Sequence, residues 1–204
     1  AARRRGRAGQ ILRVALVVAS ALVVGIPGLA WSQYRGLAAG IRRSGSLAEL
    51  AAPSGTSQNL LVMGLDSRLD ENGNPLPPAL YQALHTGGPN VGGYNANVLM
   101  LLHIPGDGGR ATAVSIPRDD YVALVGAPDG VTRGKIKQAY GLAFDRQHRT
   151  LVAQGVTDPA TLEQRSRDAG RSAEIATVSQ FLGGVPIEHF VEVTMVAFYE
   201  VAQV

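Results

Sequence analysis

The sequence contains no cysteine. It therefore has no disulfide framework, no thiolate nucleophile and no zinc site built on cysteine. Aromatic residues make up only 5% of the chain, and its four histidines show no metal-ligand spacing. We expect these histidines to be structural or surface residues. Apolar residues still amount to 46% of the 204 residues, so the chain is able to form a core, built mainly from aliphatic side chains.

Acidic residues are absent from residues 1–13, which hold five arginines. The rest of the chain has 14 basic residues (19 − 5) and 16 acidic residues, a net charge of −2. The overall basic character therefore belongs to the N-terminal tail. A nucleic-acid-binding domain is not indicated, and we expect no nucleic-acid partner.

A membrane-spanning segment is predicted directly after this tail. Val14 to Trp31 form an uncharged run of 18 residues with Ser20 as the only polar member. As a helix the run would span roughly 27 Å, close to the ~30 Å hydrocarbon core of a bilayer. The positive-inside rule predicts a cytoplasmic N-terminus and an extracytoplasmic location for the chain after residue 35. The alternatives are a cleaved signal peptide and a buried soluble helix. Because signal peptides have shorter apolar runs of ~7–15 residues, we expect an uncleaved, single-pass anchor in the cell membrane.

Four segments are expected from these patterns: a cytoplasmic basic tail at 1–13, a transmembrane helix at 14–31, a stalk at 32–57 and an extracytoplasmic domain at 58–204. The stalk is rich in glycine, serine and alanine, which is typical of a linker. The sequence begins without methionine and ends on Ala202-Gln203-Val204. We therefore expect it to be a piece of a longer protein, with the C-terminal part of the domain missing.

The expected domain alternates strands and helices, which favours a mixed sheet covered by helices. Apolar runs predict strands at 59–65, 98–104, 111–116 and 187–194, the second and third forming a hairpin. Helices are predicted at 135–147, at 159–182 and from Met195 onward. Residues 69–95, rich in glycine, proline and asparagine, predict a long loop. Five arginines lie among acids along the expected helices and predict a solvated face: Arg146, Arg149, Arg165, Arg167 and Arg171.

Three groups of charged residues follow predicted strands or begin a predicted helix: Gly64–Arg68, Ser115–Tyr121 and Lys135–Tyr140. They supply Arg68, Arg118 and Lys135 as donors to an anion. Asp66 and Asp119 are possible ligands of a cation. Arginine forks suit phosphate oxygens, and carboxylates suit magnesium, which prefers hard oxygen ligands. The alternative for each group alone is a surface turn held by ion pairs.

This chemistry fits displacement at a phosphoryl group, which needs charge neutralisation and alignment and no covalent nucleophile. A phosphorylated, lipid-linked substrate is compatible with a domain that is expected beside a membrane. The glycines at 87–93 lack the lysine and hydroxyl residue of a nucleotide-binding P-loop, so nucleotide binding is not indicated.

Four segments of the chain resemble the LytR-CpsA-Psr family of cell-wall glycopolymer ligases. In chain order they are Gly64–Arg68, Ser115–Asp119, Lys135-Ile136 and Gly183–Val193. The resemblance runs from about Asn59 to the last residue. It implies an α/β/α sandwich with a mixed central sheet and a long apolar cleft for a polyprenyl chain. It also implies a phosphotransferase that moves a phospho-glycan from a polyprenyl-pyrophosphate carrier to peptidoglycan. The alanine- and arginine-rich composition looks like the actinobacterial branch, in which arabinogalactan is the expected cargo.

The resemblance also implies roles for individual residues. Asp66 would be a magnesium ligand, and Arg68, Arg118 and Lys135 would bind the pyrophosphate. Asp119 would hold Arg118 or accept the acceptor's proton, so that Asp66, Arg68, Arg118 and Asp119 form the expected catalytic set.

Two departures from the family pattern affect these expectations. The family usually has an Arg-Ser-Asp-Thr motif before its second strand, where this chain reads Asn95-Ala96-Asn97-Val98. Asn97 therefore stands in the position of a second magnesium-binding carboxylate, which predicts a weakened metal site. The family's later arginine-rich motif is expected beyond Val204. Two further functions stay open: a non-catalytic binder of lipid-linked cell-wall intermediates, and a polyprenyl-pyrophosphate phosphatase.

Overall fold

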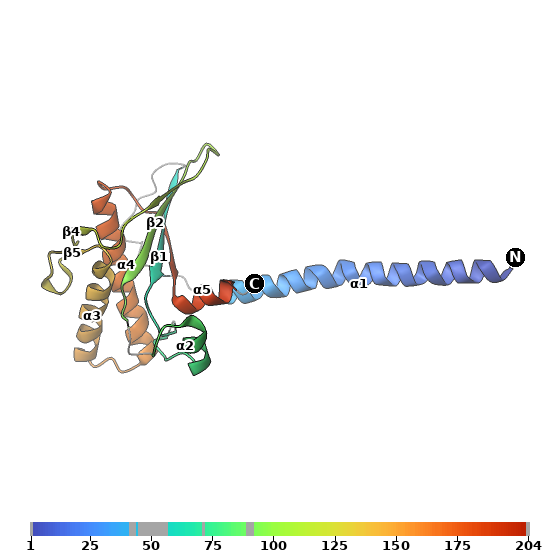
Figure 1. The fold of residues 1–204 in the computed structure, drawn as a ribbon, viewed down its shortest axis with the longest axis horizontal. Coiled ribbons are helices and arrows are strands. Elements are labelled where there is room, and N and C mark those ends of the chain that lie inside the picture. The colour runs from blue at the N-terminus through green and yellow to red at the C-terminus, as the bar shows by residue number, and fades with distance from the viewer. Residues whose placement is uncertain (1, 41–43, 45–56, 71, 89–91, 203–204) are drawn as a thin grey trace. The chain divides into compact units, whose positions relative to one another are not determined.

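The computed structural model describes residues 2–40, 44, 57–70, 72–88 and 92–202 (Figure 1). It divides into two compact units, Ala1–Arg43 and Ser44–Val204. The described residues of the first unit form one helix, α1 (Ala2–Gly40), of 39 residues. Within it, Leu12–Leu29 is an 18-residue stretch that is long and apolar enough to cross a membrane. The helix continues through the first part of the expected stalk, and residues 41–43 and 45–56 of that stalk lie outside the described residues.

The second unit is built on a four-stranded mixed sheet in the order β3-β2-β1-β6. Its strands are β1 (Gln58–Leu65), β2 (Ala96–Ile104), β3 (Thr112–Ser115) and β6 (His189–Val193). The neighbours β1 and β2 are antiparallel, as are β2 and β3, whereas β6 runs parallel to β1. The predicted hairpin between the second and third strands is confirmed. A separate pair, β4 (Tyr121–Ala123) and β5 (Arg133–Lys135), encloses a short 3-10 helix, η1 (Pro128–Gly130).

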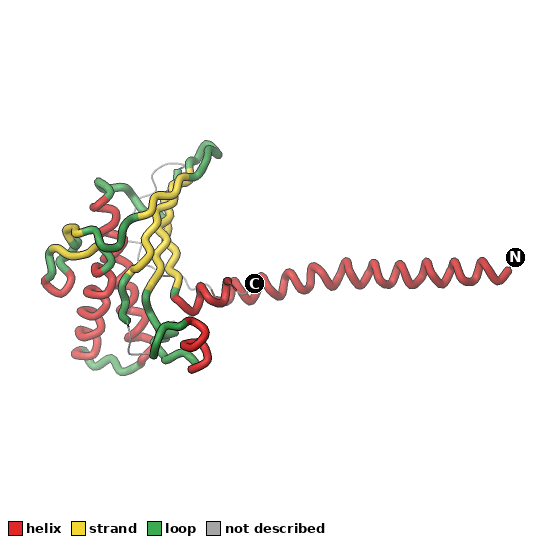
Figure 2. The backbone as a smooth tube through the Cα atoms, viewed as in Figure 1, coloured by secondary structure: helices red, strands yellow, loops and turns green. Residues whose placement is uncertain are grey.

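Helices lie on both sides of this sheet, so the predicted α/β class with a mixed central sheet is confirmed. Figure 2 shows α3 (Gln138–Ala153) and α4 (Pro159–Phe181) side by side, and Figure 1 shows α5 (Met195–Ala202) on the other side of the sheet. The predicted start of α4 is confirmed, because the Asp158 carboxylate accepts a hydrogen bond of 2.8 Å from the Thr161 N–H and Pro159 occupies the first turn.

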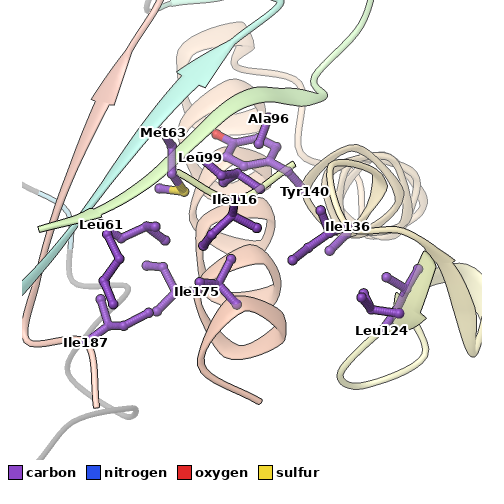
Figure 3. Packing of buried hydrophobic residues seen from close by; sticks show 14 of the residues in the cluster. Leu61, Met63, Ala96, Leu99, Ile116, Leu124, Ile136, Tyr140, Ile175 and Ile187 are labelled. Carbon is purple, nitrogen blue, oxygen red and sulfur yellow. The ribbon is translucent and has the colours of Figure 1, made fainter. Parts of the chain in front are cut away.

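The core lies between the sheet and the α3–α4 pair (Figure 3). Alternate residues of β1, Leu61 and Met63, are fully buried, as the period of two in a strand requires. They pack with Ile175 of α4 and Tyr140 of α3. The Tyr140 ring lies directly on the backbone of α4 at Gly170, where an added Cβ would be 2.6 Å from the ring. Glycine at this position therefore allows the two helices to pack closely.

The structure departs from the sequence prediction in the loop at 69–95 and at the helix predicted at 135–147, which spans Gln138–Ala153. The expected loop at 69–95 contains a short helix, α2 (Pro78–Leu84). The helix predicted from Lys135 begins at Gln138, because Lys135 pairs with Tyr121 in the β4–β5 ladder. The local pattern did not predict this pairing, since β4 and β5 are only three residues each.

The prediction that the arginines of α4 form a solvated face is wrong for Arg167 and Arg171. The Arg167 side chain is 1% exposed, and it pairs with Glu163 at 2.7 Å and with Glu192 at 3.2 Å. Arg171 pairs with Glu192 at 2.9 Å, and the Tyr140 hydroxyl donates to the same carboxylate at 2.8 Å. Because Glu192 comes from β6, the pattern along α4 alone could not reveal that these arginines face inward.

Candidate functional site

The site residues predicted from sequence gather where β1 ends and β2 begins. Leu65 is paired with Ala96, and the register shifts at the step from Gly64 to Leu65. Just beyond the ladder, the Asp66 N–H donates to the Asn95 carbonyl at 3.1 Å. The polar residues that follow β1 and those that precede β2 therefore share one edge of the sheet.

A relay of backbone hydrogen bonds joins the other two charged groups to this edge. The Ala96 N–H donates to the Lys137 carbonyl at 3.2 Å, and the Lys137 N–H donates to the Arg118 carbonyl at 3.3 Å. The turn after β3 is also held to the segment after β5, since the Ile136 N–H donates to the Asp120 carbonyl at 2.8 Å. Tertiary structure thus brings together three groups that are about 20 to 70 residues apart in the chain.

Asp66 and Arg68 form a half-buried pair within the first group. The Arg68 guanidinium donates to Asp66 Oδ1 at 2.9 Å, and its Nε donates to the Thr86 carbonyl at 2.7 Å. Gly92, with φ +94°, passes over the guanidinium so closely that a side chain there would collide with it. Arg68 therefore ties the start of the segment between β1 and β2 to Thr86 while it orients the Asp66 carboxylate.

Asp119 is the centre of a second, more exposed cluster. Its Oδ1 lies 3.1 Å from Lys135 Nζ and 3.0 Å from Lys137 Nζ, and Arg118 Nε lies 3.8 Å from its Oδ2. Hydrogen bonds from Lys137 and Lys135 lower the pKa of Asp119 below its usual value. Arg118 and Lys135 are half exposed, so their charges are accessible to an anion from solution. We refer to Arg118, Asp119, Lys135 and Lys137 as the Asp119 cluster.

Sequence reasoning did not single out Lys137 or Glu174. Lys137 belongs to the same motif as Lys135, so its charge was visible, but its contact with Asp119 was not. Glu174 of α4 is fully buried, and its Oε2 accepts a hydrogen bond of 2.9 Å from the Tyr140 N–H in the first turn of α3. Burial raises the pKa of Glu174 to about 8, with the Tyr140 bond opposing that rise. Nothing in the local sequence distinguishes Glu174 from an exposed helix residue.

The magnesium ligands expected from sequence, Asp66 and Asn97, lie near the same irregular end of the β1–β2 ladder. Both are half-buried and offer the hard oxygen donors that magnesium prefers. One oxygen of Asp66 is already occupied by Arg68. Across residues 2–40, 44, 57–70, 72–88 and 92–202, no group of three or more histidine, aspartate or glutamate residues is arranged to hold a metal. The donors fit a cation whose remaining ligands come from phosphate or water, and not a protein-only cage.

Comparison with known proteins identifies the family to which this chain belongs. The model of the LytR_cpsA_psr family matches residues 42–203, more than half of the chain. The chain belongs to the LytR_cpsA_psr family. It is also 36% identical over 180 residues to the cell wall biosynthesis protein LcpA of Corynebacterium glutamicum, a match that covers 87% of this chain. The chain spans about 33% of the length of that relative.

Solved structures of the family align with the chain as well. One is the LytR-CPS2A-psr family protein YwtF (TagT) with bound octaprenyl pyrophosphate lipid, at 19% identity and a TM-score of 0.42. That alignment covers 79% of this chain and 43% of the other. Another is TagV of B. subtilis, at 20% identity and a TM-score of 0.38, covering 70% of this chain and 37% of the other.

Proposed function

We propose that this chain belongs to a membrane-anchored phosphotransferase of cell-wall assembly. It would transfer a phospho-glycopolymer from a polyprenyl-pyrophosphate carrier to peptidoglycan outside the cytoplasmic membrane. Arabinogalactan is the glycopolymer we favour, since the relative at 36% identity is a cell wall biosynthesis protein of Corynebacterium. Membership of the family and the apolar stretch in α1 support this proposal.

The backbone relay from Asp66 through Ala96 and Lys137 to Arg118 is the observation that carries the proposal. It gathers accessible cations and a carboxylate at one edge of the sheet. Pyrophosphate transfer needs such a concentration of positive charge, because negative charge on the phosphate oxygens must be balanced while the reacting atoms align.

In the proposed reaction, a peptidoglycan hydroxyl oxygen attacks the phosphorus that bears the glycan. The bond from that phosphorus to the bridging oxygen breaks, and the carrier leaves as polyprenyl phosphate. Arg118 and Lys135 would bind the pyrophosphate oxygens, and the hydroxyl proton would pass to Asp119 or to water. Arg68 would hold Asp66 in position. If magnesium binds at Asp66 and Asn97, it would supply further charge neutralisation at the phosphates.

A non-catalytic binder of lipid-linked intermediates is the second candidate. The amide at Asn97 favours it, since the usual carboxylate at this position is absent. Hydrolysis of polyprenyl pyrophosphate, with water as the acceptor, uses the same residues and is the third outcome that an assay must separate.

The test is replacement of Arg118 by alanine in the full-length protein. Loss of its charge-assisted hydrogen bonds should weaken binding of a polyprenyl-pyrophosphate analogue by ~1.5–3 kcal/mol, roughly 10- to 150-fold. The melting temperature should change little, since the Arg118 side chain is half exposed. Arg149→Ala is the matched control, because Arg149 is an exposed arginine paired with Asp129 outside the site.

Three measurements separate the candidates. Transfer of labelled glycan to peptidoglycan identifies the transferase, release of phosphate without transfer identifies the phosphatase, and binding without either product identifies the binder. Unchanged analogue affinity in Arg118→Ala together with a large fall in melting temperature would show that Arg118 is structural and contradict the proposed site.

A further inference from the structure

The Asp119 cluster carries more positive charge than its single carboxylate neutralises. Lys135 and Lys137 both contact Oδ1 of Asp119, at 3.1 Å and 3.0 Å, and Arg118 lies 3.8 Å from Oδ2. Three cations and one carboxylate leave a formal charge of +2 (3 − 1 = 2). Because the two ammonium groups share one oxygen atom they repel each other, and an incoming anion with several oxygens would relieve that repulsion.

Lys137 is the member of the Asp119 cluster that joins the cluster to the sheet edge. Its N–H donates to the Arg118 carbonyl, and its carbonyl accepts from the Ala96 N–H directly before Asn97. The backbone of Lys137 is therefore held on both sides by segments of the proposed site. The Lys135 N–H, by contrast, donates to the Gln138 side chain.

The Lys137 side chain is also the least hydrated cation of the cluster. It is 19% exposed, against 51% for Lys135. A charge shielded from water interacts more strongly with a neighbouring ion, because the local dielectric constant is lower. An ammonium group has three N–H donors, and Asp119 is the one carboxylate within 4.0 Å of Lys137 among the described residues.

We propose that Lys137 is a phosphate-binding residue of this site. In the free protein Asp119 holds its ammonium group, and when a pyrophosphate binds, Lys137 donates to a phosphate oxygen and Asp119 loses that contact. The inference rests on the proposed function, because pyrophosphate is the ligand that function requires. It adds a third cation to Arg118 and Lys135, and it makes Asp119 a competitor of the ligand for Lys137.

The alternative is that Lys137 is only a structural counterion of Asp119. Salt bridges at protein surfaces contribute little to stability, with a median of ≈ 0–1 kcal/mol. Under that alternative, removal of the Lys137 charge leaves pyrophosphate affinity unchanged.

The experiment is calorimetric titration of the full-length protein in detergent with inorganic pyrophosphate, and separately with farnesyl pyrophosphate. Lys137→Gln should lower both affinities about tenfold, whereas Lys137→Arg should stay within about threefold. Equal losses for the two ligands show that Lys137 contacts the phosphates and not the lipid. Arg133→Gln is the matched control, because Arg133 is an exposed cation of β5 near Lys137 in the chain, and it faces the Tyr121 ring.

Competition between Asp119 and the ligand predicts a second change in affinity, opposite in direction to the loss expected in Lys137→Gln. Asp119→Asn should tighten pyrophosphate binding, and the gain should be smaller in a Lys137→Gln background. An equal gain in both backgrounds contradicts the inference. If Lys137→Gln does not fold, the same comparison of Asp119→Asn is made in a Lys137→Ala background: a smaller gain than in the wild type supports the inference and an equal gain overturns it.

Failure of the inference is distinguishable from failure of the proposed function. If Lys137→Gln binds normally while Arg118→Ala and Lys135→Gln bind weakly, Lys137 is structural and the proposed function stands. If none of the three variants loses affinity, both proposals are wrong.

Discussion

At the scale of single residues, the two acid–cation groups of the site differ in exposure, and this difference separates their expected roles. The Arg68 side chain is 14% exposed and bonded to Asp66 and Thr86, whereas Arg118 and Lys135 are half exposed beside Asp119. The Arg68 guanidinium is already hydrogen-bonded to two partners, so we expect it to hold Asp66 and Thr86 in position. Cations at the surface remain available to a ligand.

Asn97 allows a prediction at this scale. An amide oxygen can bind magnesium but brings no charge, so substrate phosphates would have to hold most of the ion. We expect wild-type protein to bind magnesium poorly alone and better with a polyprenyl-pyrophosphate analogue. Asn97→Asp should tighten magnesium binding by ~1 kcal/mol or more, about fivefold, in a magnesium titration.

Asn95→Asp serves as the control for Asn97→Asp, since the Asn95 side chain faces α3 near Gly141. Tight magnesium binding by the wild type without ligand would show that Asn97 does not limit the site. An unchanged affinity in Asn97→Asp would show that Asn97 lies outside it.

At the scale of elements, Glu174 attaches α4 to the first turn of α3, just after Lys137. Burial raises the pKa of Glu174 to about 8 from an ordinary value of 4.5, so the folded protein favours the neutral carboxyl. Between these two values the unfolded chain has released its proton and the folded protein retains it. Stability therefore falls as pH rises from about 4.5 to about 8, by up to ~1.4 kcal/mol per pH unit.

Urea unfolding measured from pH 5 to pH 8.5 tests this prediction for Glu174. Glu174→Gln cannot ionise and should lose this contribution, so the variant gains stability relative to wild type as pH rises. Glu200→Gln, at an exposed position of α5, should follow the wild-type profile. Parallel profiles of Glu174→Gln and wild type would mean that the Glu174 pKa is not raised.

The buried ion pairs of α4 lead to a second prediction about elements. Arg167→Met would leave Glu163 and Glu192 buried without their shared partner, which typically costs ~3–5 kcal/mol. Arg165→Met is the matched control, because Arg165 is exposed on the same helix and should change stability by less than ~0.5 kcal/mol. Urea unfolding of both variants measures the difference, and similar small losses would argue against a buried network.

At the scale of the whole molecule, the chain combines an apolar helix with a separate α/β unit. The arginine-rich tail before Leu12–Leu29 predicts that the α/β unit lies outside the cytoplasmic membrane and stays attached to it. Reporter fusions after residue 45 should make an exported reporter enzyme active and leave a cytoplasmic reporter silent. The reverse pattern, or release of the domain in soluble form, would refute this topology.

Much of the fold was predictable because its signals are local. Continuous apolar runs predicted β1, β2, β3 and β6, and Asp158-Pro159 predicted the start of α4. The β4–β5 pair was missed because strands of three residues are too short to show a period of two. The helix α2 was missed because its seven residues make fewer than two turns within a loop rich in glycine and proline.

The charged groups of the site were visible in the sequence, but their partners were not. Charge type and spacing identified Asp66, Arg118 and Lys135 as residues suited to phosphate chemistry. The sequence by itself determined the apolar helix, the strand order along the chain and the family. Only the tertiary structure decided that Lys137 contacts Asp119 and that Arg167 is buried against Glu192. Such contacts join residues far apart in the chain, and they depend on how the sheet and the α3–α4 pair pack rather than on any local pattern.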